Sequence, residues 1–372
     1  MIFGVPFFGW MMSVVFRCCQ DYELGKLKDQ LQDMISSLGA ENLIHSGDRV
    51  LMKPNLIAPR PVVDAVCTHP AMIRALAMII LDCGGQPYIG DSPGYASLER
   101  CLAESGTQAV VDELGIKVVS FKTRVEVSRS ENRILKRFQL AGPVLEFDRI
   151  INVPKLKTHG MMGLTLAVKN LFGCIPGYDK ARWHLRAGHN RQLFARILLD
   201  IYQTVKPDLH ILDGVVGMEG EGPTHGQAVL FGILAASRDG IGLDYATARF
   251  IHYPENTPVS QEAINAGLLD PGKLKVLGDC LVEEIPAIKT AKGSDDAAFP
   301  FHRLIRRLLV KKPVISSSRC HRCLVCVKHC PAQAMKFIDR SVRIDYKACI
   351  RCFCCHELCP YGAVRVKWGL LR

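Results

Sequence analysis

Short apolar runs alternate with longer amphipathic stretches from about Ser13 to Gly278, a pattern typical of an α/β protein. The strands are expected at residues 13–17, 49–52, 87–89, 116–119, 148–153 and 209–212. The helices are expected at residues 24–38, 70–83, 98–114 and 191–205. Glycines follow the first two predicted helices, where they would act as C-terminal caps. The pattern predicts a large domain over residues 13–299, built on a mostly parallel sheet.

The stretch before the first predicted strand, residues 1–12, is interpreted as an N-terminal extension. It is apolar, but it has no basic start and no small-residue cleavage motif. It is also shorter than the roughly 20 residues that span a bilayer. We therefore expect a cytoplasmic protein without an integral membrane segment.

Residues 301–312 show a helical pattern inside a predicted linker over residues 300–318. One face would carry the apolar side chains Phe301, Leu304, Ile305, Leu308 and Leu309. The other would largely carry the basic side chains Arg303, Arg306, Arg307 and Lys311. Two alternatives remain open for this basic amphipathic helix: its apolar face packs on the main domain, or it makes peripheral contact with an anionic membrane.

The charge of the chain is unevenly distributed. Its 372 residues carry a formal net charge of +11, and 48% of them are hydrophobic. Residues 1–299 hold 31 Lys and Arg against 33 Asp and Glu, whereas residues 300–372 hold 16 against 3. Because the excess lies in the last fifth of the chain, a protein that binds nucleic acid over its whole surface is not expected.

Half of the 16 cysteines form two regular sets near the C-terminus. Residues 320–331 follow the spacing C-x2-C-x2-C-x3-C-P, and residues 349–360 repeat it 29 positions later. The similarity extends to residues 334–337 and 363–366, which indicates a duplicated unit. In a reducing compartment such crowding points to metal binding. Paired zinc sites are the alternative, but they need neither the third cysteine nor the fourth before proline.

This duplicated unit, residues 319–372, resembles the bacterial ferredoxin module with two [4Fe-4S] clusters. In that module three close cysteines bind one cluster and the fourth binds the other. The resemblance implies that Cys320, Cys323, Cys326 and Cys359 hold the first cluster. It implies that Cys349, Cys352, Cys355 and Cys330 hold the second. Cys354 is extra to the pattern and is interpreted as a spare thiol.

The ferredoxin-like unit is basic, with 11 Lys and Arg against 3 Asp and Glu in residues 319–372. A basic surface near a cluster would attract an acidic redox partner protein. The alternatives are a solvated surface or docking on the main domain.

Polar or glycine-containing segments follow four of the predicted strands, and ligands of open α/β sheets gather at such strand ends. Lys155, Lys157 and His159 would share one side of an extended segment and form a cationic wall for a carboxylate or phosphate. The further candidates for this ligand pocket are Lys53, Asn55, Lys169 and Asn170. The candidates for proton transfer or a divalent metal are Asp91, Asp213 and Glu219. Each has an alternative interpretation as a loop charge, a turn residue or a helix cap.

The order of these motifs resembles the family called domain of unknown function 362. The motifs are Lys53-Pro54-Asn55-Leu56, Gly90-Asp91-Ser92-Pro93-Gly94, residues 154–159, residues 169–173, Asp213-Gly214 and residues 218–223. The resemblance covers residues 14–280 and implies an iron-sulfur protein, because this domain is often fused to a ferredoxin module. It implies no particular substrate.

Neither a G-x-G-x-x-G fingerprint after a strand nor a P-loop is present, so no NAD, flavin or nucleotide site is expected. The leading hypothesis is an oxidoreductase whose clusters relay electrons to a small anionic substrate or cofactor in the α/β domain. One alternative is an electron-transfer or assembly accessory without substrate chemistry of its own. Another is a non-redox enzyme in which the clusters are structural.

Overall fold

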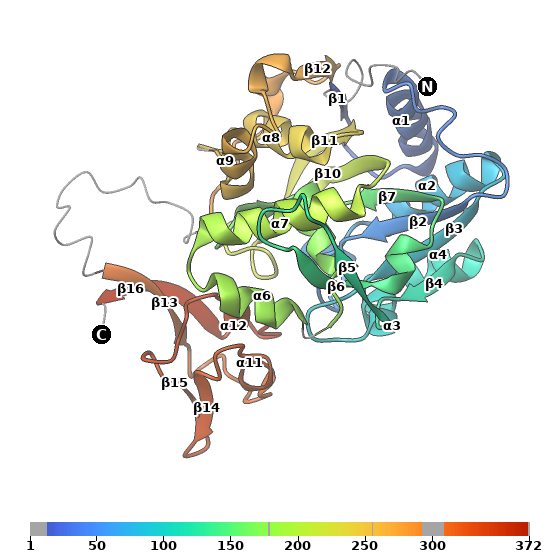
Figure 1. Cartoon of the computed structure of the whole chain (residues 1–372). Helices are drawn as coiled ribbons and strands as arrows, with labels where there is room; N and C mark the ends of the chain where they lie inside the picture. The colour runs from blue at the N-terminus through green and yellow to red at the C-terminus, as the bar shows by residue number, and fades with distance from the viewer. Residues whose placement is uncertain (1–12, 178, 255, 292–308, 371–372) are drawn as a thin grey trace.

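A computed structural model describes residues 13–177, 179–254, 256–291 and 309–370. Figure 1 shows a large α/β domain and a small C-terminal domain, drawn in orange and red, that packs near helix α6 (Asp179–Ala187). The N-terminal extension predicted at residues 1–12 lies outside the described residues.

The described part of the large domain is built on one sheet with the strand order β12-β1-β11-β10-β7-β2-β3-β4. Strands β10, β7, β2, β3 and β4 pair in parallel, as predicted, whereas β11 pairs antiparallel with both β1 and β10. A short hairpin of β8 and β9 adds to β10. The bounds are β1 Ser13–Cys18, β2 Arg49–Pro54, β3 Gln86–Asp91, β4 Lys117–Ser120, β7 Arg149–Val153, β8 Lys155–His159, β9 Gly163–Thr165, β10 Leu209–Glu219, β11 Gln227–Ser237 and β12 Lys275–Gly278.

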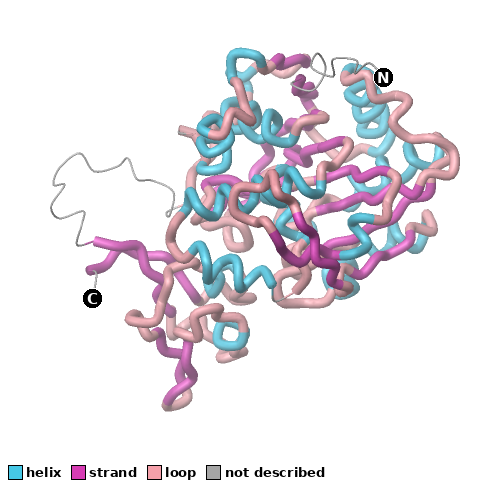
Figure 2. The backbone as a smooth tube through the Cα atoms, in the orientation of Figure 1, coloured by secondary structure: helices cyan, strands magenta, loops and turns pink. Residues whose placement is uncertain are grey.

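Helices cover both faces of this sheet, as Figure 2 shows. The cause is visible in β2, where successive side chains point to opposite faces. Val50 and Met52 pack with the helices α1 and α2, whereas Leu51 packs with α7. The bounds are α1 Leu24–Ser37, α2 Pro70–Asp82, α3 Leu98–Glu104, α4 Thr107–Glu113, α5 Ala167–Asn170, α7 Arg191–Val205, α8 Gly240–Phe250 and α9 Pro258–Asn265.

The predicted helix at residues 98–114 is two helices, α3 and α4. Gly106 lies between them with a φ of +77°, which a right-handed helix cannot include. A separate hairpin of β5 (Arg124–Ser128) and β6 (Arg137–Ala141) follows β4 and was not predicted. The other predicted helices and strands are present with bounds shifted by a few residues, except that β10 continues seven residues beyond its predicted end.

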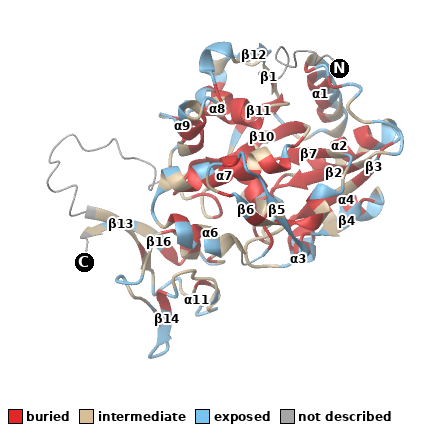
Figure 3. Cartoon of the chain, viewed as in Figure 1, coloured by how far each residue is buried: buried red, intermediate tan, exposed pale blue. Residues whose placement is uncertain are grey.

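The described part of the small domain, residues 309–370, has two antiparallel strand pairs and two short helices. Strand β13 (Leu309–Ile315) pairs with β16 (Val364–Leu370), and β14 (Met335–Ile338) pairs with β15 (Ser341–Ile344). The helices are α11 (Val325–Lys328) and α12 (Cys354–Glu357). Figure 3 shows that much of this domain is only partly buried, in contrast to the core of the large domain.

The prediction of a helix through Lys312 is wrong at its C-terminal end. Residues 309–312 are part of strand β13, because their backbone pairs with β16. The small domain therefore begins inside the segment that was predicted to be a linker, and residues 301–308 lie outside the described residues.

Candidate ligand pocket between the two domains

A buried ion pair joins the ends of two neighbouring parallel strands, β2 and β3. Lys53 Nζ lies 2.8 Å from Asp91 Oδ1, and both side chains are at least 95% buried. The Asp91 carboxylate also accepts hydrogen bonds from the backbone N–H groups of Leu56 and Ser92, each at 2.8 Å. Asp91 is thus fully engaged in fixing the loops that follow both strands.

Gly173 allows a third segment to approach this pair. A Cβ atom at position 173 would lie 2.1 Å from Asp91 Oδ1 and 2.6 Å from Lys53 Nζ, which is closer than atoms can approach. With the Lys53–Asp91 pair in this position only glycine fits at residue 173, three residues after Asn170.

The second lysine of the predicted site, Lys155, belongs to a separate buried cluster. Its Nζ lies 2.7 Å from Asp213 Oδ2 and donates to the Tyr22 hydroxyl at 3.0 Å. That hydroxyl donates to Asp213 Oδ1 at 2.7 Å, and burial together with Asp213 raises the pKa of Tyr22 above its ordinary range. Within this group of side chains, the carboxylate of Asp213 compensates the positive charge of Lys155.

The third lysine, Lys157, is held by oxygen acceptors alone. Its Nζ donates to Asn55 Oδ1 and to the carbonyl oxygen of Val66, both at 2.6 Å. Complete burial without a carboxylate at hydrogen-bond distance lowers the pKa of Lys157 to about 7. Asn55 in turn donates to Asn170 at 2.8 Å, so a chain of amides links this lysine to the α5 segment.

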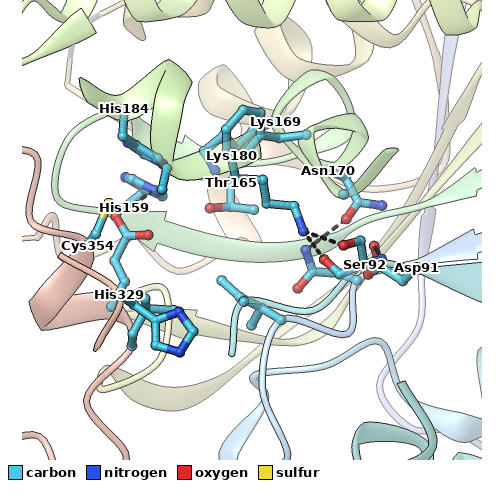
Figure 4. A pocket seen from close by; sticks show the side chains of 18 of the residues that line it. Asp91, Ser92, His159, Thr165, Lys169, Asn170, Lys180, His184, His329 and Cys354 are labelled. Atoms are coloured by element: carbon cyan, nitrogen blue, oxygen red, sulfur yellow. Dashed lines mark hydrogen bonds and ion pairs between the residues drawn. The ribbon is translucent and has the colours of Figure 1, made fainter. Parts of the chain in front are cut away.

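A cavity of about 110 Å³ lies between the two domains, beyond these strand ends. The large domain lines it with predicted candidates, namely Asn55, Asp91, His159, Lys169 and Asn170. The small domain contributes His329, Cys354, Glu357 and Leu358. Figure 4 shows Asp91, Ser92 and Asn170 at one end of the pocket and His159, His329 and Cys354 at the other.

Two lysines give the pocket its positive charge. Lys169 Nζ lies over the rings of Phe172 and Phe194, at 5.0 and 5.9 Å, and makes no hydrogen bond or ion pair with a described residue. Lys180, on α6, donates to the carbonyl oxygens of Ser92 and Pro93 and to the Ser92 hydroxyl. Although the Lys180 residue is half-buried, its ammonium is enclosed by these groups, and burial lowers its pKa to about 7.

Two buried histidines in the pocket wall are neutral. Burial and the nearby lysines lower the pKa of His184 to about 3 and that of His159 well below its ordinary value. His159 Nδ1 accepts the backbone N–H groups of Met161 and Met162, each at 3.1 Å, so its proton resides on Nε2. That atom lies 3.2 Å from Glu357 Oε1, although the N–H is not aligned for a hydrogen bond.

The structure separates the predicted candidates into two groups. Asn55, Asp91, His159, Lys169 and Asn170 line the pocket, whereas Lys53, Lys155, Lys157, Asp213 and Glu219 do not. The carboxylate of Glu219 instead binds Lys289: Oε1 lies 3.0 Å from Lys289 Nζ, and Oε2 accepts the Lys289 backbone N–H at 2.9 Å. Lys180 and the small-domain residues were missed, because they belong to a helix and a domain that carry no strand-end signal.

The four cysteines assigned to the first cluster line one common cavity in the small domain. Burial and the thiols of Cys359, Cys323 and Cys320 raise the pKa of Cys326 to about 11. A thiophilic cation would reverse this effect, since its charge stabilises thiolates. Burial and the thiols of Cys352 and Cys330 raise the pKa of Cys349. The donor sets therefore fit the crossed ligation of a two-cluster module.

The two cysteine loops also repeat their backbone geometry 29 positions apart. Arg322 and Leu324 have positive φ values of 55° and 60°, and Arg351 and Phe353 have 55° and 59°. The sulfur atoms of Cys330 and Cys359 accept the backbone N–H groups of Ala334 and Ala363, both at 3.2 Å. Such donors stabilise the thiolates that iron requires, so both loops are shaped to hold a metal group.

A second, larger groove of about 780 Å³ lies between the domains beside the first cysteine set. It includes Arg319, Arg365 and Lys367, whose side chains form no ion pair with a described residue. Arg60 of the large domain crosses the groove and donates to the carbonyl oxygen of Pro360 at 2.8 Å. The carboxylates of Asp64 and Glu221 also line the groove, but the four cations outnumber them, so the groove is basic and is built by both domains.

Among the described residues, no helix is both long and apolar enough to cross a bilayer.

The lactate racemase apoprotein from Thermoanaerobacterium thermosaccharolyticum is a solved structure with a TM-score of 0.40 and 11% identity to this chain. The comparison covers 65% of this chain and 58% of that one, so this chain spans less than two thirds of its length.

Sequence comparisons identify the family of the chain. The thylakoid-associated protein sll1697 of Synechocystis sp. is 37% identical over 234 residues, which are 63% of this chain and 72% of that protein. The family described as a 4Fe-4S dicluster domain matches residues 312–360, so this is an iron-sulfur protein. The family described as domain of unknown function (DUF362) matches residues 50–249, and the chain therefore belongs to the DUF362 family.

Proposed function

We propose that this chain is an iron-sulfur oxidoreductase that binds two [4Fe-4S] clusters and acts on a small anionic ligand in the interdomain pocket. The observation that carries the proposal is the position of the pocket. The loops that hold the cysteines supply His329, Cys354 and Glu357 to a cavity that Lys169 and Lys180 make cationic. When bound, the clusters would supply one-electron transfer.

The pocket residues favour a carboxylate or phosphate. Lys169 is 91% buried, and among the described residues its ammonium contacts the rings of Phe172 and Phe194 but makes no hydrogen bond or ion pair, so an anion would compensate a charge that is costly to bury. The amides of Asn55 and Asn170 and the hydroxyl of Thr165 offer hydrogen bonds at the same wall. A cavity of about 110 Å³ suits a small ligand, since drug-sized and dinucleotide ligands occupy several hundred cubic ångströms.

The two neutral histidines and Lys180 are the groups we propose for holding or moving protons. His159 keeps its proton on Nε2 inside the pocket, and Lys180 has a pKa of about 7, near the operating range of a proton donor. Asp91 is not proposed for this role because Lys53 and two backbone N–H groups occupy its oxygens. Asp213 and Glu219 are not proposed because both lie outside the pocket.

The proposal is tested on protein purified anaerobically. Iron and sulfide analysis with EPR of the reduced protein measures the clusters, and mass spectrometry of the heat-released fraction identifies a bound anion. Oxalate and inorganic phosphate then serve as probes in calorimetric titrations of the wild type, Lys169→Gln and Arg182→Gln. Arg182 is 81% exposed, so it is the matched control. Binding that is lost in Lys169→Gln alone supports the proposal, and equal binding by all three proteins contradicts it.

A second candidate function is that of an electron-transfer accessory, which the basic groove favours. Its cations flank the first cysteine set, since Arg319 directly precedes Cys320, and Arg365 and Lys367 lie on the strand that follows Cys359. An acidic redox partner docked there would lie next to that set. Both functions need cysteine thiols that are not oxidised to disulfides. We therefore infer a reducing compartment such as the cytoplasm. If the accessory function alone holds, Lys169→Gln leaves electron exchange with the partner unchanged.

A further inference from the structure

Two cysteines and an aspartate gather at an edge of the sheet, apart from the pocket and from both cysteine sets. Cys18 ends strand β1, and Asp279 and Cys280 directly follow strand β12. The two sulfur atoms and one carboxylate oxygen all lie within 4.8 Å of one another.

The strand register explains why these residues meet. Strands β1 and β12 are parallel, and Phe16 pairs with Gly278 at the end of the ladder. Cys18 and Cys280 each lie two residues beyond this last pair, which brings their side chains together. On its other side Cys18 is paired with Ile233 of β11, so the β1–β11 ladder fixes the position of its backbone.

The carboxylate of Asp279 contacts both cysteines, through the backbone of Cys18 and the sulfur atom of Cys280. Its Oδ1 accepts the backbone N–H of Cys18 at 3.1 Å and lies 3.7 Å from Cys280 Sγ. The nearest cation, Arg17, is 4.0 Å from Asp279 Oδ2 and is held by Asp33 at 2.7 Å. Asp279 Oδ1 is therefore held by both cysteines, whereas Oδ2 makes only the long contact with Arg17 among the described residues and is open to a further ligand.

The chemistry of the three donors selects the ligand. Two thiols and one carboxylate are a mixed soft and hard set, which suits zinc, whereas calcium and magnesium prefer oxygen alone. The side chain of Asp279 is 61% exposed, which leaves access for a water molecule as fourth ligand.

We propose that Cys18, Asp279 and Cys280 form a zinc site that fastens the edge strand β12 to β1. Such a site would fix the pairing of β12 with β1 through the bound metal ion. It would be independent of the interdomain pocket. It takes a borderline-soft divalent cation and needs no iron.

The test uses the full chain with its iron-sulfur sites loaded, because empty cluster cysteines would also bind zinc. Zinc and iron are measured together by mass spectrometry after dialysis against a chromophoric chelator, for the wild type, Cys18→Ser, Cys280→Ser, Asp279→Ala and Cys83→Ser. Cys83 is a partly exposed cysteine that belongs neither to the proposed zinc site nor to the two cysteine sets, so it is the control. Circular dichroism and an unchanged iron content show that each variant folds.

The expected result is about one zinc per chain, with affinity reduced more than tenfold in both serine variants, about tenfold in Asp279→Ala, and unchanged in Cys83→Ser. X-ray absorption at the zinc edge should show two sulfur ligands at about 2.3 Å. Three results would overturn the site: no retained zinc, equal affinity in Cys18→Ser or Asp279→Ala, or a Cys18–Cys280 disulfide in protein prepared anaerobically.

Discussion

The carboxylate of Glu357 in the small domain lies 3.2 Å from the imidazole Nε2 of His159 in the large domain. Both residues are buried or nearly so, and both line the interdomain pocket. Glu357 stands between two cysteines assigned to different clusters, Cys355 and Cys359. The same short helix, α12, therefore carries a cluster cysteine on one side and closes the pocket on the other.

The first prediction concerns Cys354, which lines the pocket beside Glu357. Its counterpart 29 positions earlier is Val325, so the repeat does not require a thiol there. We expect Cys354→Ser to keep about eight iron atoms per chain, the content of two [4Fe-4S] clusters, and Cys355→Ser to lose about half. Iron and sulfide analysis with EPR measures both. A comparable iron loss in Cys354→Ser would show that Cys354 is a ligand.

The same measurement tests the crossed assignment. We expect Cys359→Ser to disturb the same EPR signal as Cys320→Ser, and Cys330→Ser to disturb the same signal as Cys349→Ser. If Cys359→Ser instead matches Cys349→Ser, each loop binds its own cluster and the crossed pairing is wrong.

Site residues that directly follow a strand could be predicted from the sequence. Site residues that are brought in by tertiary packing could not. Lys53 and Asp91 could be singled out because they end neighbouring parallel strands, and parallel strands bring such ends together. Their engagement with each other could not be foreseen, since it depends on the third segment at Gly173. Lys155, Lys157 and His159 do alternate along an extended strand, as predicted. Only His159 lines the pocket, because Lys155 binds Asp213 and Lys157 binds Asn55.

Other parts of the site had no local signal at all. Lys180 lies on a polar helix, and Glu357 occupies a variable position of the cysteine motif, so both depend on how the domains pack. The helix predicted at residues 301–312 failed at its end because strand pairing with β16 outweighed the helical periodicity of residues 309–312. Long-range pairing of this kind is not encoded in a local pattern.

The second prediction concerns the pH dependence of anion binding through Lys180. Burial lowers the pKa of Lys180 to about 7, and the ionisable groups that influence it are Asp91, Lys53, Lys169 and Cys174. The ammonium that attracts an anion is present below this pKa and is lost above it. We expect the affinity for oxalate to be highest below pH 7 and to fall several-fold between pH 7 and pH 9, as measured by calorimetry.

Lys180→Arg is the matched variant for this prediction, because a guanidinium keeps its charge over the whole range. Its affinity should fall clearly less between pH 7 and pH 9 than that of the wild type. An identical pH profile for the two proteins would assign the titration to another group, and a flat wild-type profile would contradict the prediction directly.

The third prediction concerns the buried pair of Lys53 and Asp91. Removing one partner of a buried ion pair leaves an uncompensated charge, at a cost of about 3 kcal/mol or more in the free energy of unfolding. We expect Lys53→Met to show this loss in chemical unfolding followed by circular dichroism. Lys28→Met is the control, because Lys28 pairs with an Asp82 side chain that is 53% exposed, and its loss should be at most about 1 kcal/mol. Equal losses in the two variants would mean that the buried pair contributes no more than a surface contact.

The last prediction concerns the basic groove beside the first cysteine set. The triple variant Arg319→Glu, Arg365→Glu, Lys367→Glu reverses cations that have no acidic partner among the described residues. We expect its reduction by a small acidic ferredoxin, followed by stopped-flow absorbance at low ionic strength, to slow more than tenfold. Raising the salt concentration should slow the wild type toward the same rate, because screening removes the attraction.

Two controls separate docking from damage to the clusters. Photoreduced deazariboflavin, a small neutral reductant, should reduce the triple variant and the wild type at equal rates. The variant Arg343→Glu should keep the wild-type rate with the ferredoxin, because Arg343 lies on the β14–β15 hairpin and is already paired with Asp339 at 3.0 Å. If the hairpin variant slows the reaction and the groove variant does not, the partner docks on the hairpin, and the groove has no role in electron exchange.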